Sequence, residues 1–472
     1  MLKAKNKIGK SFFLAVLVSS SSCLLLLNNG CKMSKSVVKP LQGKIKLITL
    51  DPGHFHAALV QKQMYPEVDS IVNVYAPEGI ELKSHLALIT KYNSSANQPT
   101  HWKEEVYTGA DYLEKMLSQK KGNVVVIAGN NSRKTAYITK SVEFGYNVLA
   151  DKPMAIDPQG FIQLEAAYQK AQENGVLLYD VMTERYEINS ILQKEFSQQK
   201  EIFGELVKGT IENPAITKES VHHFFKYVSG SPLVRPVWYY DVKQQAEGLV
   251  DVTTHLVDLV QWECFPEQIL NYKTDIKMLN ASRWTTPITL AQYKLSTGQN
   301  SFPSYLQSAI KDQVLQVFAN GEMNYTLKGV HAKVAVKWDF QAPEGTGDTH
   351  FSTIRGTKAN VIIRQGKEQQ YKPMLYIEPV AGQQNFEPIL AQTIKNLQTK
   401  YPGLGYQKVN SGWQILVPNQ FNVGHEEHFA QVTKAYLNYL KQGALPKWEV
   451  PNILAKYYTT TQALEKAETV NR

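Results

Sequence analysis

The stretch NVVVIAGNNSRKTAYITKSVEFGYNVLADKPMAI, residues 123–156, decides the fold class of this chain. It opens with the apolar run VVVI, continues with a helical pattern over 132–145, and returns to the apolar run NVLA at 147–150. Apolar runs of about four to eight residues are typical of buried strands, and longer mixed stretches are typical of helices. The order strand, helix, strand predicts two parallel strands joined by a crossover helix.

The same alternation extends along the chain on both sides of this stretch. Strand-like apolar runs lie at 46–50, 71–76 and 176–181, and helical patterns lie at 109–119 and 158–175. Alternating strands and helices predict an α/β fold, with an N-terminal Rossmann-like parallel sheet over residues 44–182. Ligands of such sheets lie beyond the carboxyl ends of the strands, which directs attention to the segments DPGH, AGNNS and ADKP.

The pattern changes from about residue 204 onward. Strand-rich sequence follows, including AKVAVKWDF at 332–340 and ANVIIRQ at 359–365, and the chain closes on a helical segment at 425–443. We therefore expect a second domain over 183–472, an α+β domain with a large, mostly antiparallel sheet that binds the substrate.

The first 30 residues are typical of a targeting segment. Four lysines within the first ten residues precede the apolar runs FFLAVLV and CLLLL, which is the order of a signal peptide. The sequence LNNGCKMSK resembles a bacterial lipoprotein signal, which predicts a lipid anchor on Cys31, with Cys23 as the weaker candidate and an ordinary secretory signal as the alternative. A linker over 31–43 would follow. This predicts a protein of the bacterial cell envelope, lipid-anchored, with the periplasmic side favoured.

Composition excludes several classes of function. The chain has 472 residues, of which 43% are hydrophobic and 20% charged, so it can bury a sizeable core. Removing the signal lowers the formal charge from +9 to +5, a balance that does not indicate nucleic acid as a partner. Cleavage before Cys31 leaves Cys264 alone, which excludes a disulfide framework. The segment HEEH at 425–428 lacks the spacer of H-E-x-x-H, so we predict helix surface there and no metal site.

Two motifs carry a resemblance to a known family. The stretch ending in DKP at 151–153 resembles the third and fourth strands of the Gfo/Idh/MocA family of sugar and cyclitol oxidoreductases, in which an E-K-P motif ends the unit. EGLVDVTTHLVDLVQW at 247–262 is similar to the family's second motif, a glycine cluster followed by D-x-G-x-H-x-x-D. The resemblance covers the chain from about residue 44. It implies an NAD(P)-dependent oxidoreductase acting on CH–OH groups of carbohydrates.

The resemblance implies a catalytic pocket formed by Lys152, Asp251 and His255. Oxidising a secondary alcohol requires a base for the hydroxyl proton, and a nearby cation stabilises the developing alkoxide. We expect His255 to be the base and Lys152 to hold the reacting oxygen, while Asp251 binds a substrate hydroxyl or orients the imidazole. The surrounding residues 249–260 are apolar nearly all round, as in a buried helix, and ionisable groups are costly there unless they face a polar site.

The cofactor turn is the part that departs from the family pattern. Aligned with G-x-G-x-x-G, the sequence DPGHFH keeps only Gly53, with Asp51 and His56 at the other two positions. An aspartate beside a pyrophosphate is unfavourable unless it is turned away or paired. We expect NAD, with NADP not excluded, because Ala76 replaces the usual acidic residue after the second strand. The candidate cofactor-binding residues are Gly53, His54, Phe55, Glu78, Asn131 and Lys152.

The predicted substrate contacts rest on softer signals. Trp238 and Tyr239 suit either stacking on a sugar ring or core packing, and Arg185 and Tyr186 stand where the family often has an Arg-Phe pair. Residues 345–359 form a glycine-bounded segment that suits either a pocket loop or a plain hairpin connection. Asp258 suits either a substrate contact or a brace for its helix. The candidate substrate-binding residues are Arg185, Tyr186, Trp238, Tyr239, Asp258, Asp348 and His350.

Together these features predict a periplasm-facing oxidoreductase with a small-molecule sugar or glycoside as its partner. Free nicotinamide nucleotide is scarce outside the cytoplasm, so the cofactor would be held tightly and regenerated in place by a second carbohydrate. Two alternatives stay open: an NAD-dependent glycoside hydrolase of the same family, and a carbohydrate-binding protein that has lost catalysis. Membrane contact is expected only through the N-terminal anchor, and a homo-oligomer formed through the C-terminal sheet is left open.

Overall fold

The computed structural model describes residues 40–228 and 231–471. The predicted signal peptide, the Cys31 anchor and most of the predicted linker lie outside the described residues, so the structure does not test them. Within the described part of the chain, no helix is both long enough and apolar enough to cross a membrane.

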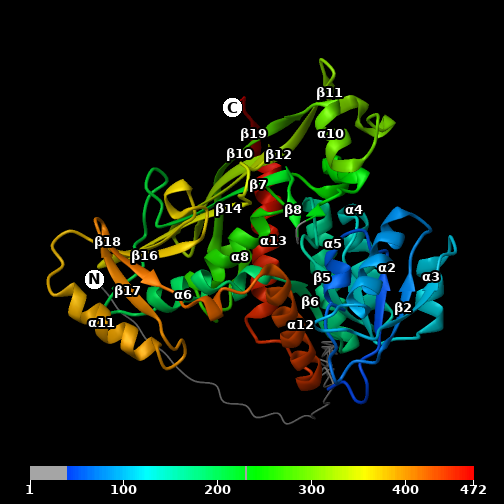
Figure 1. Cartoon of the computed structure of the whole chain (residues 1–472), viewed down its shortest axis with the longest axis horizontal. Helices are drawn as coiled ribbons and strands as arrows, with labels where there is room; N and C mark the ends of the chain where they lie inside the picture. Colours follow the sequence, from blue (N-terminus) through cyan, green and yellow to red (C-terminus); the bar gives the residue numbers. More distant parts are fainter. Residues whose placement is uncertain (1–39, 229–230, 472) are drawn as a thin grey trace, which may run out of the picture. The chain divides into compact units, whose positions relative to one another are not determined.

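The N-terminal part forms a parallel six-stranded sheet with strand order β3-β2-β1-β4-β5-β6 (Figure 1). The order reverses between β1 and β4, which is where such sheets bind their ligands. This confirms the predicted Rossmann-like sheet. Its strands are β1 (Leu47–Leu50), β2 (Ile71–Tyr75), β3 (Lys103–Tyr107), β4 (Val124–Ile127), β5 (Asn147–Asp151) and β6 (Leu178–Val181). Its helices are α1 (His56–Leu59), α2 (Ile80–Asn93), α3 (Tyr112–Gln119), α4 (Asn131–Glu143) and α5 (Pro158–Asn174).

The sequence accounts for most of these elements. Strands β1, β4 and β6 are buried along their whole length, as expected for a parallel sheet covered on both faces. The Asn130 side chain caps α4 by accepting a hydrogen bond from the Ser132 N–H, and Asp157 caps α5 in the same way. Strand β3, with the sequence KEEVY, and helix α2 have no counterpart among the predicted elements. β3 is an edge strand, where charged residues are tolerated and the apolar pattern is weak.

The C-terminal part forms an eleven-stranded sheet within the described residues. Its order is β17-β18-β16-β15-β14-β7-β13-β12-β10-β19, with β11 paired to β12, and only the pairs β13–β7 and β10–β19 are parallel. This confirms the predicted large, mostly antiparallel sheet. The strands are β7 (Ile216–Phe225), β10 (Ile276–Ile288), β11 (Ile310–Lys311), β12 (Val314–Leu327), β13 (Val330–Gln341), β14 (Thr349–Arg355), β15 (Ala359–Arg364), β16 (Met374–Pro379), β17 (Gly405–Val409), β18 (Gly412–Leu416) and β19 (Ala467–Thr469).

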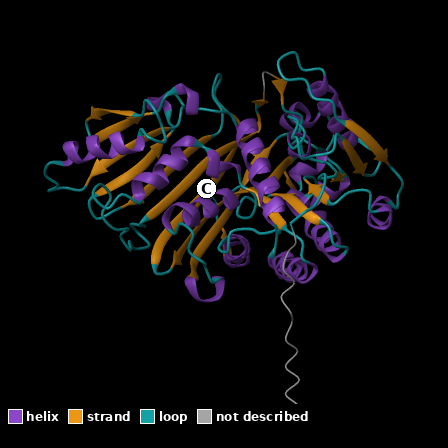
Figure 2. Cartoon of the chain, turned by 90° about the horizontal axis from the view of Figure 1, so that it is seen from below, coloured by secondary structure: helices purple, strands orange, loops and turns teal. Residues whose placement is uncertain are grey.

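Helices lie against the strands of this sheet (Figure 2). The chain also contains a small hairpin of β8 (Tyr227–Val228) and β9 (Ser231–Pro232). The remaining helices are α6 (Ile188–Ser197), α7 (Val242–Gln245), α8 (Thr253–Cys264), α9 (Tyr272–Asp275), α10 (Leu290–Thr297), α11 (Phe386–Leu397), α12 (His425–Gln442) and α13 (Glu449–Lys466). Short 3₁₀ helices are η1 (Thr183–Tyr186), η2 (Val237–Tyr240), η3 (Ser304–Ala309), η4 (Lys367–Gln369) and η5 (Asn419–Phe421).

The last two long helices return to the first sheet. Phe429 and Tyr436 of α12 and Tyr457 of α13 are buried in the same apolar core as the parallel strands. The ring of Tyr436 stacks on that of Tyr179 in β6, with centroids 5.7 Å apart. Helix α13 also packs against α8 and β10, so it holds the second motif against the parallel sheet. The expected boundary between 182 and 183 therefore separates the two sheets but not their hydrophobic cores.

Candidate active site

The turn after β1 crosses over the carboxyl end of β4. The backbone N–H groups of Gly53 and His54 both donate to the Ala128 carbonyl at 3.1 Å. A Cβ atom on Gly129 would collide with the Asp51 carbonyl oxygen and would lie 3.0 Å from the Gly53 nitrogen. Glycine at 129 is therefore needed because the turn passes directly over it. Gly129 was not among the predicted site residues, although the pair Gly129–Asn130, just after a buried strand, is a turn signal.

Asp51 does not face a phosphate. Its carboxylate accepts hydrogen bonds from the Arg133 guanidinium at 3.1 Å and from the Tyr137 hydroxyl at 2.8 Å, both on α4. The backbone at Asp51 is left-handed, with φ 45°, which turns the side chain toward that helix. The aspartate is thus turned away and paired, which removes the electrostatic objection to a dinucleotide at this turn.

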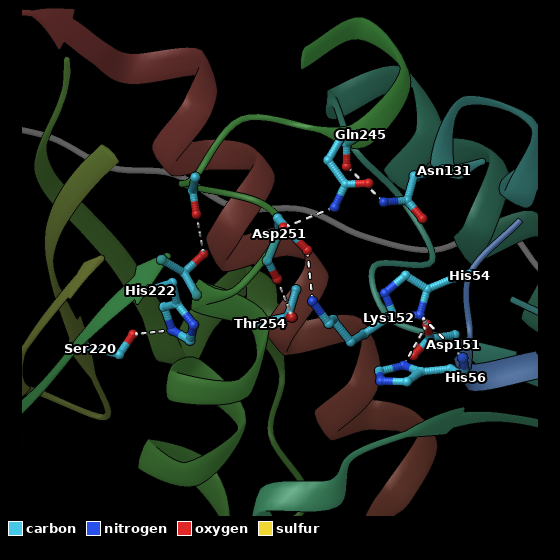
Figure 3. Close-up of polar contacts among 12 residues, drawn as sticks. His54, His56, Asn131, Asp151, Lys152, Ser220, His222, Gln245, Asp251 and Thr254 are labelled. Atoms are coloured by element: carbon cyan, nitrogen blue, oxygen red, sulfur yellow. Dashed lines mark hydrogen bonds and ion pairs between the residues drawn. The ribbon is translucent and has the colours of Figure 1, made fainter. Parts of the chain in front are cut away.

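The crossing turn brings two histidines to the end of β5 (Figure 3). His56 Nδ1 lies 2.9 Å from Asp151 Oδ2, and His54 Nδ1 lies 3.7 Å from the same oxygen. Burial and the neighbouring His56 hold the pKa of His54 well below 6.5. Burial would raise the pKa of Asp151, but the charge and hydrogen bond of His56 outweigh it and lower that pKa. His54 is thus neutral and Asp151 ionised near neutral pH.

A groove of about 560 Å³ runs beside this turn. It lies at the carboxyl ends of β1 and β2, the place predicted for a dinucleotide, and has the size of a small-molecule site. Glu81 lines it, whereas the predicted ribose contact Glu78 is exposed and does not. The lining includes Gly53, His54 and Phe55 from the turn, Ile80, His85 and Leu88 from α2, and Arg235, Val237 and Tyr239 from the segment before the second motif.

Two groups in the groove suit an anionic, hydrogen-bonding ligand, and both were missed from sequence. Arg235 is buried, donates to the carbonyls of Phe224 and His223 at 3.0 Å, and has no carboxylate partner among the residues the structure describes. His85 is buried, both of its ring nitrogens lack a partner, and burial lowers its pKa to about 4. Unpaired buried polar groups are costly unless a ligand satisfies them. The groove therefore fits NAD(P), with Arg235 placed for phosphate and His85 for a hydrogen bond.

Lys152 and Asp251 meet as predicted (Figure 3). Lys152 Nζ, following β5, donates to Asp251 Oδ1 at 2.7 Å, and the Gln245 amide donates to Asp251 Oδ2 at 3.1 Å. Asn131 belongs to the same network, because its amide donates to the Gln245 carbonyl at 2.6 Å. The structure thus joins the parallel sheet to the second motif through one charged pair. Lys152 is not among the residues that line the groove, whereas His54, 3.7 Å from the neighbouring Asp151, does line it.

His255 lies one helical turn after Asp251, at the start of α8. It is half-buried, and its Nδ1 is buried without a hydrogen-bond partner. Burial and the charge of Lys152 hold the pKa of His255 well below 6.5. The imidazole is therefore neutral near neutral pH, which is the form that a general base requires.

Lys134 is a buried lysine that sequence reasoning missed. Its Nζ donates to Asn131 Oδ1 at 2.6 Å and to the backbone carbonyl of Lys152 at 3.1 Å. Burial lowers its pKa to about 8. The contact fixes the backbone from which Lys152 projects. A lysine one turn into a buried helix is the only sequence signal that pointed to it.

The Asp348 carboxylate is held by partners that were not predicted. Its carboxylate contacts His222 and His223 at 3.1 Å and Lys226 at 2.5 Å, all from β7 or just after it. Burial lowers the pKa of both His222 and Lys226, and the positive charge of Lys152 contributes a smaller lowering. His350 lies two residues further on in β14, with its Nε2 unpartnered.

Arg185 and Asp258, both predicted to bind substrate, are used within the protein instead. Arg185 makes a two-pronged ion pair with Asp258 at 2.6 and 2.7 Å, and its third nitrogen donates to Glu449 at 2.8 Å. Lys456 donates to Asp258 at 3.1 Å and to Asp180 at 2.6 Å. All of these side chains are at most 8% exposed. The polar atoms of both residues are satisfied, which corresponds to the bracing role we left open for Asp258.

The aromatic candidates pack in the interior. Trp238 and Tyr239 are buried in an aromatic core, and the Trp238 ring is 3.3 Å from the position that a Cβ on Gly53 would take. Tyr239 also lines the groove, where the Arg235 guanidinium lies 4.3 Å from its ring centre. Tyr186 is partly buried against the core of the parallel sheet. Core packing therefore accounts for Trp238 and Tyr186, while Tyr239 has one face on the groove.

Fold and site together define a dinucleotide-binding protein with a second, sheet-based domain. The family model described as "Oxidoreductase family, NAD-binding Rossmann fold" matches residues 55–180. The model described as "Putative oxidoreductase C terminal domain" matches residues 192–468. The chain belongs to this Gfo/Idh/MocA oxidoreductase family, and it is an NAD(P)-binding oxidoreductase. None of the curated proteins matches the chain.

Solved structures agree with this assignment. The chain is 54% identical to a "putative oxidoreductase" from Parabacteroides merdae, with a TM-score of 0.88, over 91% of this chain and 98% of the other. It shares its fold with a 3-ketoreductase from Actinomadura kijaniata solved with NADP, at 12% identity and TM-score 0.55, over 91% and 99% of the two chains. It also shares its fold with a levoglucosan dehydrogenase solved with NADH and levoglucosan, at 11% identity and TM-score 0.56, over 90% and 98%.

Proposed function

We propose that this protein transfers a hydride between NAD(P) and a secondary alcohol or ketone of a sugar or glycoside. The observation that carries the proposal is the Lys152–Asp251 pair, 2.7 Å apart, beside a neutral His255 with an unpartnered ring nitrogen. The family supports the oxidoreductase class. Of two proteins of the same fold, one is named a 3-ketoreductase, which supports the ketone chemistry, and the other a levoglucosan dehydrogenase, which supports the substrate class.

Each side chain has a role that its contacts allow. Bound NAD(P) supplies the hydride acceptor for oxidation, or the donor for reduction. His255 takes the proton of the substrate hydroxyl, and the Lys152 ammonium stabilises the negative charge that develops on the oxygen. Asp251 fixes Lys152 through one carboxylate oxygen, while Gln245 occupies the other. The histidines and lysine around Asp348 offer hydrogen bonds to further sugar hydroxyls.

The test is product analysis with the cofactor measured separately. Purified protein is denatured, and any released nicotinamide nucleotide is identified by mass spectrometry. The intact protein is then supplied with sugars and glycosides, and the products are identified. Released NAD(H) or NADP(H) together with a keto sugar supports the proposal. Release of an aglycone would instead assign a glycoside hydrolase, and bound sugar without any nicotinamide would assign a binding protein.

We further propose that the enzyme works at the cell envelope, attached through a lipid on Cys31, and retains its cofactor between turnovers. The support is the order of basic, apolar and small residues before Cys31. Cell fractionation of the Cys31→Ala variant tests this, with loss of membrane association as the expected result. Unchanged fractionation would contradict the anchor. A homo-oligomer through the C-terminal sheet stays a prediction.

A further inference from the structure

His54, His56 and Asp151 form a cluster that the oxidoreductase chemistry does not use. Each offers one ligand atom, and these atoms all lie within 4.8 Å of one another. Figure 3 shows both imidazoles directed toward the Asp151 carboxylate. No metal site was predicted from the sequence; His56 and Asp151 are 95 positions apart, so no short metal-binding spacing connects them.

The spacing of the ligand atoms suits one small ion. A tetrahedral ion with bonds of about 2.1 Å separates its ligand atoms by about 3.4 Å. The separations from Asp151 Oδ2 are 2.9 Å to His56 Nδ1 and 3.7 Å to His54 Nδ1, one on each side of that value. Small side-chain movements would therefore bring all three atoms to bonding distance. Two imidazoles and one carboxylate are a common ligand set for divalent transition metals.

A second observation points to a missing ligand. Asp151 is 5% exposed, and its Oδ1 is buried without a hydrogen-bond partner among the described residues. A buried carboxylate oxygen left in this state is costly, and a bound cation would remove the cost. His54 Nδ1 is also in the form that binds a cation. It accepts a long hydrogen bond, 3.3 Å, from the His56 backbone N–H, so it carries a lone pair and no proton.

The surrounding structure keeps the ligands in place. The turn that carries both histidines passes over Gly129, where any side chain would collide with it. The ring of His425, the first residue of α12, stacks on His56 with centroids 5.1 Å apart. His56 is thus held between Asp151 and a second ring, as an orienting outer layer holds a metal ligand.

We propose that His54, His56 and Asp151 bind one divalent transition-metal ion, with Zn²⁺ as the representative. Three protein ligands leave a fourth position for water or another oxygen ligand. Because His54 also lines the dinucleotide groove, the ion would lie at the groove wall. Binding of the ion would replace the hydrogen bond between His56 Nδ1 and Asp151 Oδ2 with a bond from each atom to the metal. This inference is independent of the proposed sugar chemistry.

Equilibrium dialysis against Zn²⁺ tests the site. The protein is first stripped with a chelator, and bound zinc is then measured by elemental analysis, with Co²⁺ in parallel for its visible absorption band. We expect one ion per chain for the parent. His54→Ala, His56→Phe and Asp151→Asn should each lose it, whereas the exposed His101→Ala serves as the matched control and should retain it. His56→Phe keeps a ring that can stack on His425. Loss of bound zinc from this variant would therefore show that a metal ligand has been removed, and not that packing has changed.

Folding and cofactor content are measured on the same samples. Zn²⁺ should raise the melting temperature of the parent and of His101→Ala, but not that of Asp151→Asn. If Asp151→Asn fails to fold, His54→Ala on the partly exposed turn decides the question. The proposal is overturned if the parent binds no ion. It is also overturned if His425→Ala alone abolishes binding while Asp151→Asn retains it. Nicotinamide is measured separately, so its loss cannot be mistaken for loss of metal.

Discussion

Helix α8 carries two charged clusters that look alike in sequence and differ in the structure. Just before this helix Asp251 meets Lys152, His255 lies in the first helical turn, and one turn further on Asp258 meets Arg185. In both clusters the closest contact between cation and carboxylate is 2.6 to 2.7 Å. The first cluster contains a half-buried imidazole with an unpartnered nitrogen and a lysine that is 14% exposed, whereas the charged side chains of the second are paired and at most 8% exposed. The two clusters therefore differ in whether a side chain has a polar atom without a partner, and not in the types of residue. This difference separates the cluster proposed to be reactive from the structural one.

The two clusters also differ in what removing one member should do. A fully buried ion pair contributes little net stability over an apolar replacement, but loss of one partner leaves the other charge unpaired in a low-dielectric interior. The Lys152–Asp251 pair is less tightly enclosed, at 14% and 6% exposure, and Gln245 still donates to Asp251 when Lys152 is removed, so the cost there should be smaller. We therefore expect substitutions in the Asp258 cluster to affect folding and substitutions in the Lys152 cluster to affect catalysis.

The largest expected effect is on stability, in the Asp258 cluster. Arg185→Ala leaves Asp258 and Glu449 without their main partner and should lower the free energy of unfolding by about 3 to 5 kcal/mol. Lys400→Ala, which removes an exposed pair with Glu195, is the control and should cost less than about 1 kcal/mol. Denaturant titration of both variants gives the comparison. Equal costs for the two substitutions would mean that the buried network is not what the distances indicate.

The second expected effect is on turnover, in the Lys152 cluster. His255→Ala should retain bound cofactor and fold normally, yet lose about a hundredfold or more in turnover, the usual scale for a general base. Lys152→Ala should do likewise. The double variant should be little worse than either single variant, because both groups act on one proton transfer. Parental turnover in both single variants would remove this site from the reaction.

Local sequence patterns predicted the features that depend on neighbouring residues in the chain. Buried runs such as LITL and VVVI indicated the parallel strands, and the two family motifs led to Lys152, Asp251 and His255. Sequence reasoning missed the charged edge strand β3, whose side chains lack an apolar pattern. It also could not show that Arg185 pairs with Glu449, 264 positions away, because such a pair depends on how α13 returns to the first sheet.

The cofactor turn shows the same limit. Loss of two glycines from the G-x-G-x-x-G pattern looked like erosion of a binding site. In the structure the missing glycine function has moved to Gly129, and Asp51 is paired with Arg133. No periodicity reveals such an exchange, because it depends on one strand end passing over another. The buried Arg235 and His85 were missed for the same reason, since each reaches the groove from a different segment.

The smallest expected effect concerns pH and sharpens the assignment of the base. Burial and Lys152 lower the pKa of His255, while Asp151 and Asp258 raise it and His425 lowers it slightly further, with a net pKa well below 6.5. Only the neutral imidazole accepts a proton, so activity should persist as the pH falls through 6.5 and decline only below it. The measurement is kcat/KM against pH, with bound cofactor quantified at each point so that its release is not read as loss of the base. A decline centred at or above pH 6.5, with cofactor still bound, would show that a group other than this His255 takes the proton.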